Sequence, residues 1–166
     1  YATPPVQIFV MPRAGGEPRQ LTDMPVNVSG VSWRSDGQAL AFSADLAQRD
    51  EHTYPKADLW SVSLDGTVSR LTEDELNWSR PLWAPDGRSL VATASTGLDV
   101  IIRERWDHGS PTDLWLVSAD GSTRRNLTEA WDLIPGSPTW TPDGRHLLFS
   151  AGIGGNSHLF RLEVET

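Results

Sequence analysis

Apolar and polar positions alternate in short runs along the chain, and one such run occurs three times. The copies read SWRSDGQALAF at residues 32–42, LWAPDGRSLVA at 82–92 and TWTPDGRHLLF at 139–149. Each copy has an apolar run ending in tryptophan, a three-residue turn ending in Asp-Gly, and a second apolar run. Such turns between apolar runs are typical of β-hairpins, in which the glycine takes the positive φ of the turn. The sequence therefore predicts three hairpins, and we expect each tryptophan to pack in the core.

A second pattern follows the first two hairpins. It reads DLWSVSLDG at residues 58–66 and DLWLVSADG at 113–121, and each copy precedes a short segment ending in Leu-Thr. A related pair of segments occupies residues 7–22, and HLFRLEV at 158–164 carries the first half again. Together the two patterns make a unit of four short strands with a period of roughly 50 residues, which indicates a repeat protein.

Four short strands per repeat are typical of one blade of a β-propeller. We assign residues 7–22 to the end of a blade, 28–72 and 77–128 to two full blades, and 136–164 to an incomplete blade. No window has the sustained 3.6-residue periodicity of helices. The expected fold is all-β: a partial β-propeller of four-stranded antiparallel blades, about three to three and a half in number, whose ring is not closed. We expect a portion of a longer protein, and self-association through the open propeller edges.

Antiparallel pairing within a blade places both Asp-Gly turns on one face of the propeller, here called the turn face. The loops between second and third strands lie on the opposite face, called the loop face. Two of these loops, 45–57 and 95–112, are long and charged, whereas the matching loop at 152–157 is short and glycine-rich. Binding residues usually lie on such loops when a rigid scaffold presents them.

The loop face therefore holds the candidate contacts with a peptide or a neighbouring domain. Arginine can grip a carboxylate with two hydrogen bonds, and tryptophan offers a flat apolar surface. The alternative, in which these residues have no binding role, is ion pairing inside the loop, with Glu104 and Asp107 as partners. The candidates are Arg49, Asp50, Glu51, His52, Arg103, Arg105, Trp106 and His108.

A metal site is the other hypothesis for these loops. His52 and His108 occupy corresponding loops of adjacent blades, and each has carboxylates beside it in the sequence. No spaced set of ligands accompanies them, so we expect solvated loop charges and no bound metal.

Composition narrows the classes of function. Of 166 residues, 14 are Lys or Arg and 22 are Asp or Glu, giving a net charge of −8 that argues against a nucleic-acid partner. No apolar run is long enough to span a membrane, so we expect no membrane partner, and we expect no secretion signal. The absence of cysteine excludes disulfides and thiolate chemistry.

The combined pattern, P-x-W-x-P-D-G-x-x-(L/I)-x-F, then D-L-W-x-V-x-x-D-G, then R-L-T, resembles a known propeller repeat over residues 7–164. The prolyl-oligopeptidase family of serine peptidases and the TolB-type proteins share that repeat. Long loops before Asp58 and Asp113 favour the acylaminoacyl-peptidase-like branch of the peptidases, because TolB-type loops are compact. That resemblance implies a cytoplasmic propeller that gates and orients peptide for a separate α/β-hydrolase domain. The TolB-like alternative implies a periplasmic propeller that binds protein partners without catalysis.

No catalytic residue is assigned in this chain. The family's nucleophile motif, G-x-S-x-G, is missing, and the nearest string, GNSHL at residues 155–159, lacks the final glycine of the sharp elbow. We therefore expect no catalysis by this chain and no cofactor. A serine peptidase activity is expected only of the parent protein.

Overall fold

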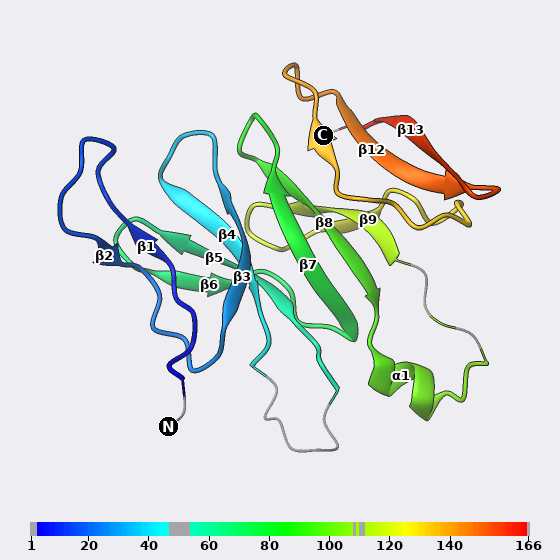
Figure 1. Ribbon diagram of the computed structural model, residues 1–166, viewed down its shortest axis with the longest axis horizontal. Coiled ribbons are helices and arrows are strands. Elements are labelled where there is room, and N and C mark those ends of the chain that lie inside the picture. The colour runs from blue at the N-terminus through cyan, green and yellow to red at the C-terminus, as the bar shows by residue number, and fades with distance from the viewer. Residues whose placement is uncertain (1–2, 47–53, 108, 110–111, 166) are drawn as a thin grey trace.

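The computed structural model describes residues 3–46, 54–107, 109 and 112–165. Within these residues thirteen strands form four antiparallel sheets, and one short helix, α1 (Leu98–Arg103), lies between β8 and β9. The first sheet is a two-stranded pair of β1 (Phe9–Val10) and β2 (Arg19–Gln20). The sheets stand side by side along the chain like the blades of an open fan (Figure 1).

In each of the other three sheets, the strands follow one another in chain order from one edge to the other. The second contains β3 (Val28–Trp33), β4 (Ala39–Ala44), β5 (Asp58–Ser63) and β6 (Val68–Arg70). The third contains β7 (Leu76–Trp83), β8 (Ser89–Thr96), β9 (Thr112–Ser118) and β10 (Arg124–Asn126). The fourth contains β11 (Thr139–Trp140), β12 (His146–Ile153) and β13 (Asn156–Glu163). The predicted fold class, an all-β partial propeller whose ring is not closed, is confirmed.

The hairpin turns form for the local reason that the sequence gives. Gly37, Gly87 and Gly144 take φ values of 69°, 68° and 69°, which a residue with a Cβ adopts only with strain. The aspartate before each glycine accepts a hydrogen bond from the backbone N–H two residues later, at 2.9 to 3.0 Å. The turn therefore satisfies its own backbone, and the same turn repeats without help from neighbouring sheets.

A buried threonine closes the outer edge of each of the first three sheets. The hydroxyl oxygen accepts a hydrogen bond from a backbone N–H at the start of the third strand, at 2.9 to 3.0 Å. The pairs are Thr22 with Ile8, Thr72 with Leu59, and Thr128 with Leu114. An N–H buried here would otherwise have no partner, which explains the recurring Leu-Thr.

Two of the three tryptophans before the turns pack their sheet against the one that precedes it. Trp83 joins Ala41 and Leu59 of the second sheet in one cluster, and Trp140 joins residues of the third sheet in another. The prediction of core packing is confirmed for these two. It is wrong for Trp33, which is 51% exposed because only the short pair β1–β2 precedes its sheet in the described part of the chain.

The first strands of successive sheets lie next to one another. The backbone N–H of Trp83 donates to the Ser32 hydroxyl at 3.2 Å, and the indole N–H of Trp140 donates to the Leu82 carbonyl at 3.5 Å. The last strands, β6 and β10, occupy the opposite edges of their sheets. In a propeller this places β3, β7 and β11 along the central axis and β6 and β10 at the rim. Over the residues that the structure covers, no helix has the length and apolarity to span a membrane.

Candidate functional site

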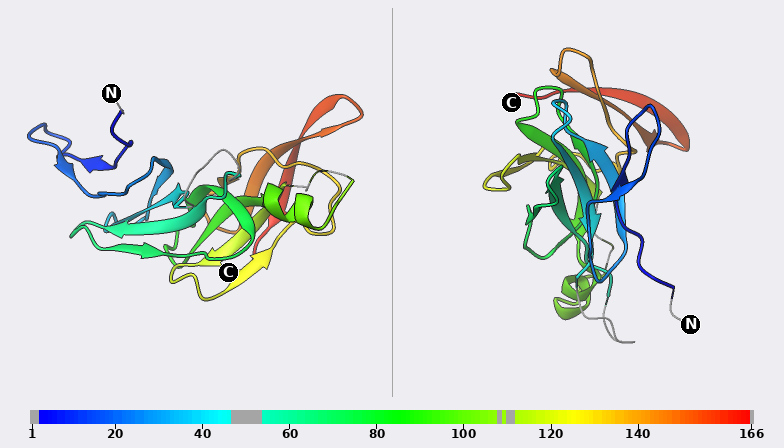
Figure 2. Two further views of the ribbon diagram at one scale, coloured as in Figure 1. Left: turned by 90° about the horizontal axis from the view of Figure 1, so that it is seen from below. Right: turned by 90° about the vertical axis from the view of Figure 1, so that its left-hand side faces the viewer.

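The loop of residues 95–112 contains a helix, where the sequence predicted irregular structure. Helix α1 starts after Gly97 and has Asp99 in its first turn and Arg103 in its last. These charges oppose the partial charges of the helix ends and stabilise so short a helix. In Figures 1 and 2, α1 projects from the end of the array opposite the β7–β8 turn. It therefore stands on the loop face.

The chain after α1 leaves the helix through a Schellman cap. The Trp106 N–H donates to the Ile101 carbonyl at 3.0 Å, and the Arg105 N–H donates to the Ile102 carbonyl at 3.2 Å. Arg105 takes a φ of 55° at the position where glycine is the usual residue. Two backbone hydrogen bonds therefore fix the direction of Arg105 and Trp106, and the Trp106 side chain remains 43% exposed.

Arg103 is engaged in local ion pairs. Its guanidinium contacts Glu104 at 3.1 Å and Glu75, in the segment before β7, at 2.9 Å. Hydrogen bonds to Glu104 and then Glu75 raise the pKa of Arg103 above its ordinary value. Arg105 forms no hydrogen bond or ion pair through its guanidinium within the described ranges. Of the two arginines, Arg105 is therefore better placed to meet a ligand.

The other predicted contact residues, Arg49, Asp50, Glu51, His52 and His108, lie outside the described residues. Their grouping with Arg105 and Trp106 stays a prediction. The part of the chain that the structure describes contains no cluster of three or more His, Asp or Glu side chains able to hold a metal ion.

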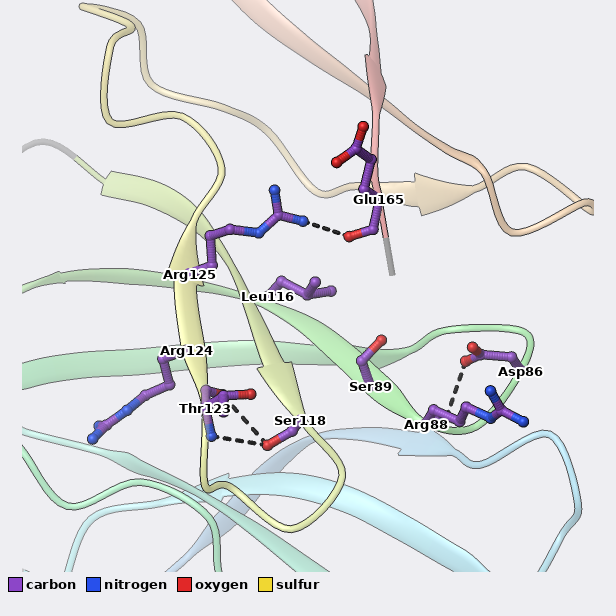
Figure 3. A pocket seen from close by; sticks show the side chains of 9 residues that line it. All are labelled: Asp86, Arg88, Ser89, Leu116, Ser118, Thr123, Arg124, Arg125 and Glu165. Atoms are coloured by element: carbon purple, nitrogen blue, oxygen red, sulfur yellow. Dashed lines mark hydrogen bonds between the residues drawn. The ribbon is translucent and has the colours of Figure 1, made fainter.

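A cavity of about 410 Å³ lies on the turn face, beside the hairpins of the third sheet. Figure 3 shows its lining, which includes Ser89, Leu116 and Arg125, with Glu165 from the segment after β13. Arg125 donates to the Glu165 backbone carbonyl at 2.5 Å, and Arg124 forms an ion pair with Asp74. Both arginines thus tie adjoining segments of the scaffold together.

Sequence reasoning did not identify this cavity. Ser89 is only 7% exposed, and its hydroxyl has no hydrogen-bond partner among the residues that the structure covers. The corresponding residue of the second sheet is Ala39, and Val68 stands where the third sheet has Arg124. These two differences between the repeats were the sequence signal for the cavity, because the blade itself does not require a polar residue at either position.

Known proteins related to the chain fall into two groups. An uncharacterized peptidase of Bacillus subtilis, YuxL, is 30% identical over 146 residues, covering 73% of this chain and 21% of that protein. The Tol-Pal system protein TolB of Anaeromyxobacter dehalogenans is 29% identical over 126 residues, covering 76% of this chain and 24% of that protein. No family model matches the chain. The chain spans about a fifth to a quarter of these curated relatives.

Solved structures that are similar in fold include members of both groups. A putative TolB from Agrobacterium tumefaciens superposes with a TM-score of 0.64 at 23% identity, over 95% of this chain and 57% of that one. A prolyl endopeptidase superposes with a TM-score of 0.60 at 16% identity, over 89% of this chain and 23% of that one. The chain is therefore a propeller segment similar both to peptidases of the prolyl-oligopeptidase type and to TolB.

Proposed function

We propose that residues 1–166 form a non-catalytic propeller portion of a prolyl-oligopeptidase-family serine peptidase, in its acylaminoacyl-peptidase-like branch. This portion gates and orients peptide for an α/β-hydrolase domain that other residues supply. The observation that carries the proposal is the long insertion between β8 and β9, with its helix and capped Arg105–Trp106 pair. Compact TolB-type loops do not need such an insertion.

The geometry of this pair suits a peptide. An exposed indole offers apolar area with little rotamer entropy to lose, and a guanidinium supplies paired donors for a carboxylate or a carbonyl. The Schellman cap holds both residues in a fixed direction before a ligand arrives, which lowers the cost of binding.

The competing proposal is a TolB-like propeller that binds protein partners and performs no chemistry. The identity of 29% to a TolB protein, close to the 30% to a peptidase, supports it. In the peptidase interpretation the parent protein is cytoplasmic, and in the TolB-like interpretation it is periplasmic. The two interpretations use the same blades and differ in what the loop face meets.

Substitutions Arg105→Ala and Trp106→Ala in the full-length protein test the peptidase interpretation. Each is expected to raise KM for peptide by about fivefold, the effect of roughly 1 kcal/mol of lost binding, with kcat little changed. Because these residues contact bound peptide and not the reacting atoms, their loss weakens binding without slowing the chemical step. Steady-state kinetics with a series of peptides measure both constants.

Arg103→Ala is the matched control, since it removes an arginine of the same helix that is already paired. It is expected to leave KM within about twofold of the unchanged protein. Unaltered KM in both the Arg105 and Trp106 variants would contradict a peptide contact at this loop.

A further inference from the structure

Arg80, in the first strand of the third sheet, has a backbone conformation that disfavours arginine. Its φ is 53°, at a β-bulge where the pairing of β7 with β8 shifts between Ser79 and Leu82. The second sheet has the same bulge between Ser29 and Ser32, and Gly30 occupies the matching position with a φ of 64°. The bulge therefore calls for a left-handed residue, and glycine meets that need without the strain of a Cβ.

The side chain of Arg80 reaches the segment that precedes β11. Its Nη1 donates to the Ser137 hydroxyl at 3.2 Å, although 57 residues separate the two. Gly30, Arg80 and Ser137 each stand three residues before the tryptophan of their repeat. They therefore lie at the same height along the propeller axis, one from each of three successive sheets.

The remaining donors of Arg80 form no hydrogen bond to protein in the described part of the chain. The guanidinium forms no ion pair there, although the chain carries eight more negative than positive charges. Arg80 and Ser137 are both exposed. A single long hydrogen bond to an exposed hydroxyl does not offset the free-energy cost of the strained backbone, since exposed polar contacts contribute little to stability. Strain of this kind is concentrated at ligand sites.

We propose that Arg80, with Ser137 beside it, is an anion site on the propeller axis that takes a carboxylate of a peptide. The guanidinium grips both carboxylate oxygens with parallel N–H donors, and the Ser137 hydroxyl holds the fork in place and offers a further donor. The anion site depends on the propeller arrangement and not on the peptidase assignment, whereas the choice of a peptide carboxylate as its ligand rests on the proposed function.

Arg80→Gly in the full-length protein tests the site, with Ala-Ala-Ala-Ala as the probe in its free-acid and C-terminally amidated forms. The variant is expected to bind the free acid about tenfold more weakly, as the loss of a charge-assisted contact predicts. Binding of the amide should be the same in both proteins. The thermal midpoint of the variant should be equal or higher, because glycine adopts the bulge conformation without strain.

Arg80→Lys is the matched control, because it retains the charge and loses the planar fork. It should lose most of the preference for the free acid while keeping some salt-dependent attraction. Two results would overturn the proposal. One is a lower thermal midpoint of Arg80→Gly with unchanged preference for the free acid, which would make Arg80 a structural brace. The other is competition by inorganic phosphate with no preference for free acid over amide, which would remove the peptide carboxylate as ligand.

Discussion

Aspartates in the turns between third and fourth strands have the most strongly shifted acidities. Asp65 accepts hydrogen bonds from the Ser63 hydroxyl and from the Thr67 N–H at 2.9 Å. Asp120 accepts them from the Ser118 hydroxyl at 2.6 Å and from the Ser122 N–H at 3.0 Å. The serine hydroxyls first, and the backbone N–H groups second, lower the pKa of each carboxyl from 3.8 to about 2. These donors favour the ionised form in the folded state.

Stability should therefore fall in acid over a defined range. A pKa that is lower in the folded state stabilises it fully above pH 3.8, and the contribution is lost as pH falls toward 2. The double variant Asp65→Asn, Asp120→Asn should have a lower thermal midpoint at neutral pH and a shallower decline in this range. Thermal unfolding followed at successive pH values measures both. Parallel curves for the two proteins would contradict the role of these carboxylates.

Residues whose conformation depends on near neighbours in sequence were predictable. The Asp-Gly turns follow from the hydrogen bonding of aspartate and the freedom of glycine at Gly37 and its repeats. Arg80 was not predictable in this way, because its positive φ comes from pairing with β8, and arginine gives no sign of it. The exposure of Trp33 likewise depends on a neighbouring sheet and not on its own repeat.

At the scale of elements, equivalent strands differ by what covers them. Leu59 in β5 and Leu114 in β9 are completely buried, whereas Leu159, at the same position of β13, is 76% exposed. No sheet follows β13 among the described residues. A leucine that the repeat normally buries thus lies on an open apolar face, which favours association with further blades or with another copy.

The isolated 166-residue chain is expected to self-associate through such faces. Leu159→Glu should shift the population toward monomer, because a charge buried in the contact loses its hydration. Ile102→Glu is the control: Ile102 is 50% exposed on α1, away from the end sheets. Light scattering over a range of concentrations measures the mass. A chain that remains monomeric throughout, before any substitution, would refute self-association by the open ends.

The loops limited prediction at this scale too. Charge and length marked residues 95–112 as a candidate site, but α1 and its cap were not foreseen, since a six-residue helix has too few positions to show periodicity. The strands were predictable because each is held by a motif that recurs. The turn-face cavity was missed because it forms between segments as distant as Leu116 and Glu165.

At the scale of the whole molecule, the chain provides an array of sheets with three surfaces of different character. The turn face repeats a local motif and holds the cavity beside Ser89. The loop face carries the capped Arg105–Trp106 pair, and the axis carries Arg80. The peptide recognition that we propose at the last two surfaces needs no catalytic residue in this chain. In the function that we propose, hydrolysis is carried out by another part of the parent protein.

Labelling of the full-length protein with a fluorophosphonate, which reacts with activated serine nucleophiles, tests the peptidase assignment most directly. Peptide mapping by mass spectrometry then locates the modified serine. We predict a single adduct on a serine outside residues 1–166, with loss of peptide hydrolysis as the adduct forms. An adduct within residues 1–166, or neither adduct nor hydrolysis in the folded full-length protein, would contradict a non-catalytic propeller of a serine peptidase.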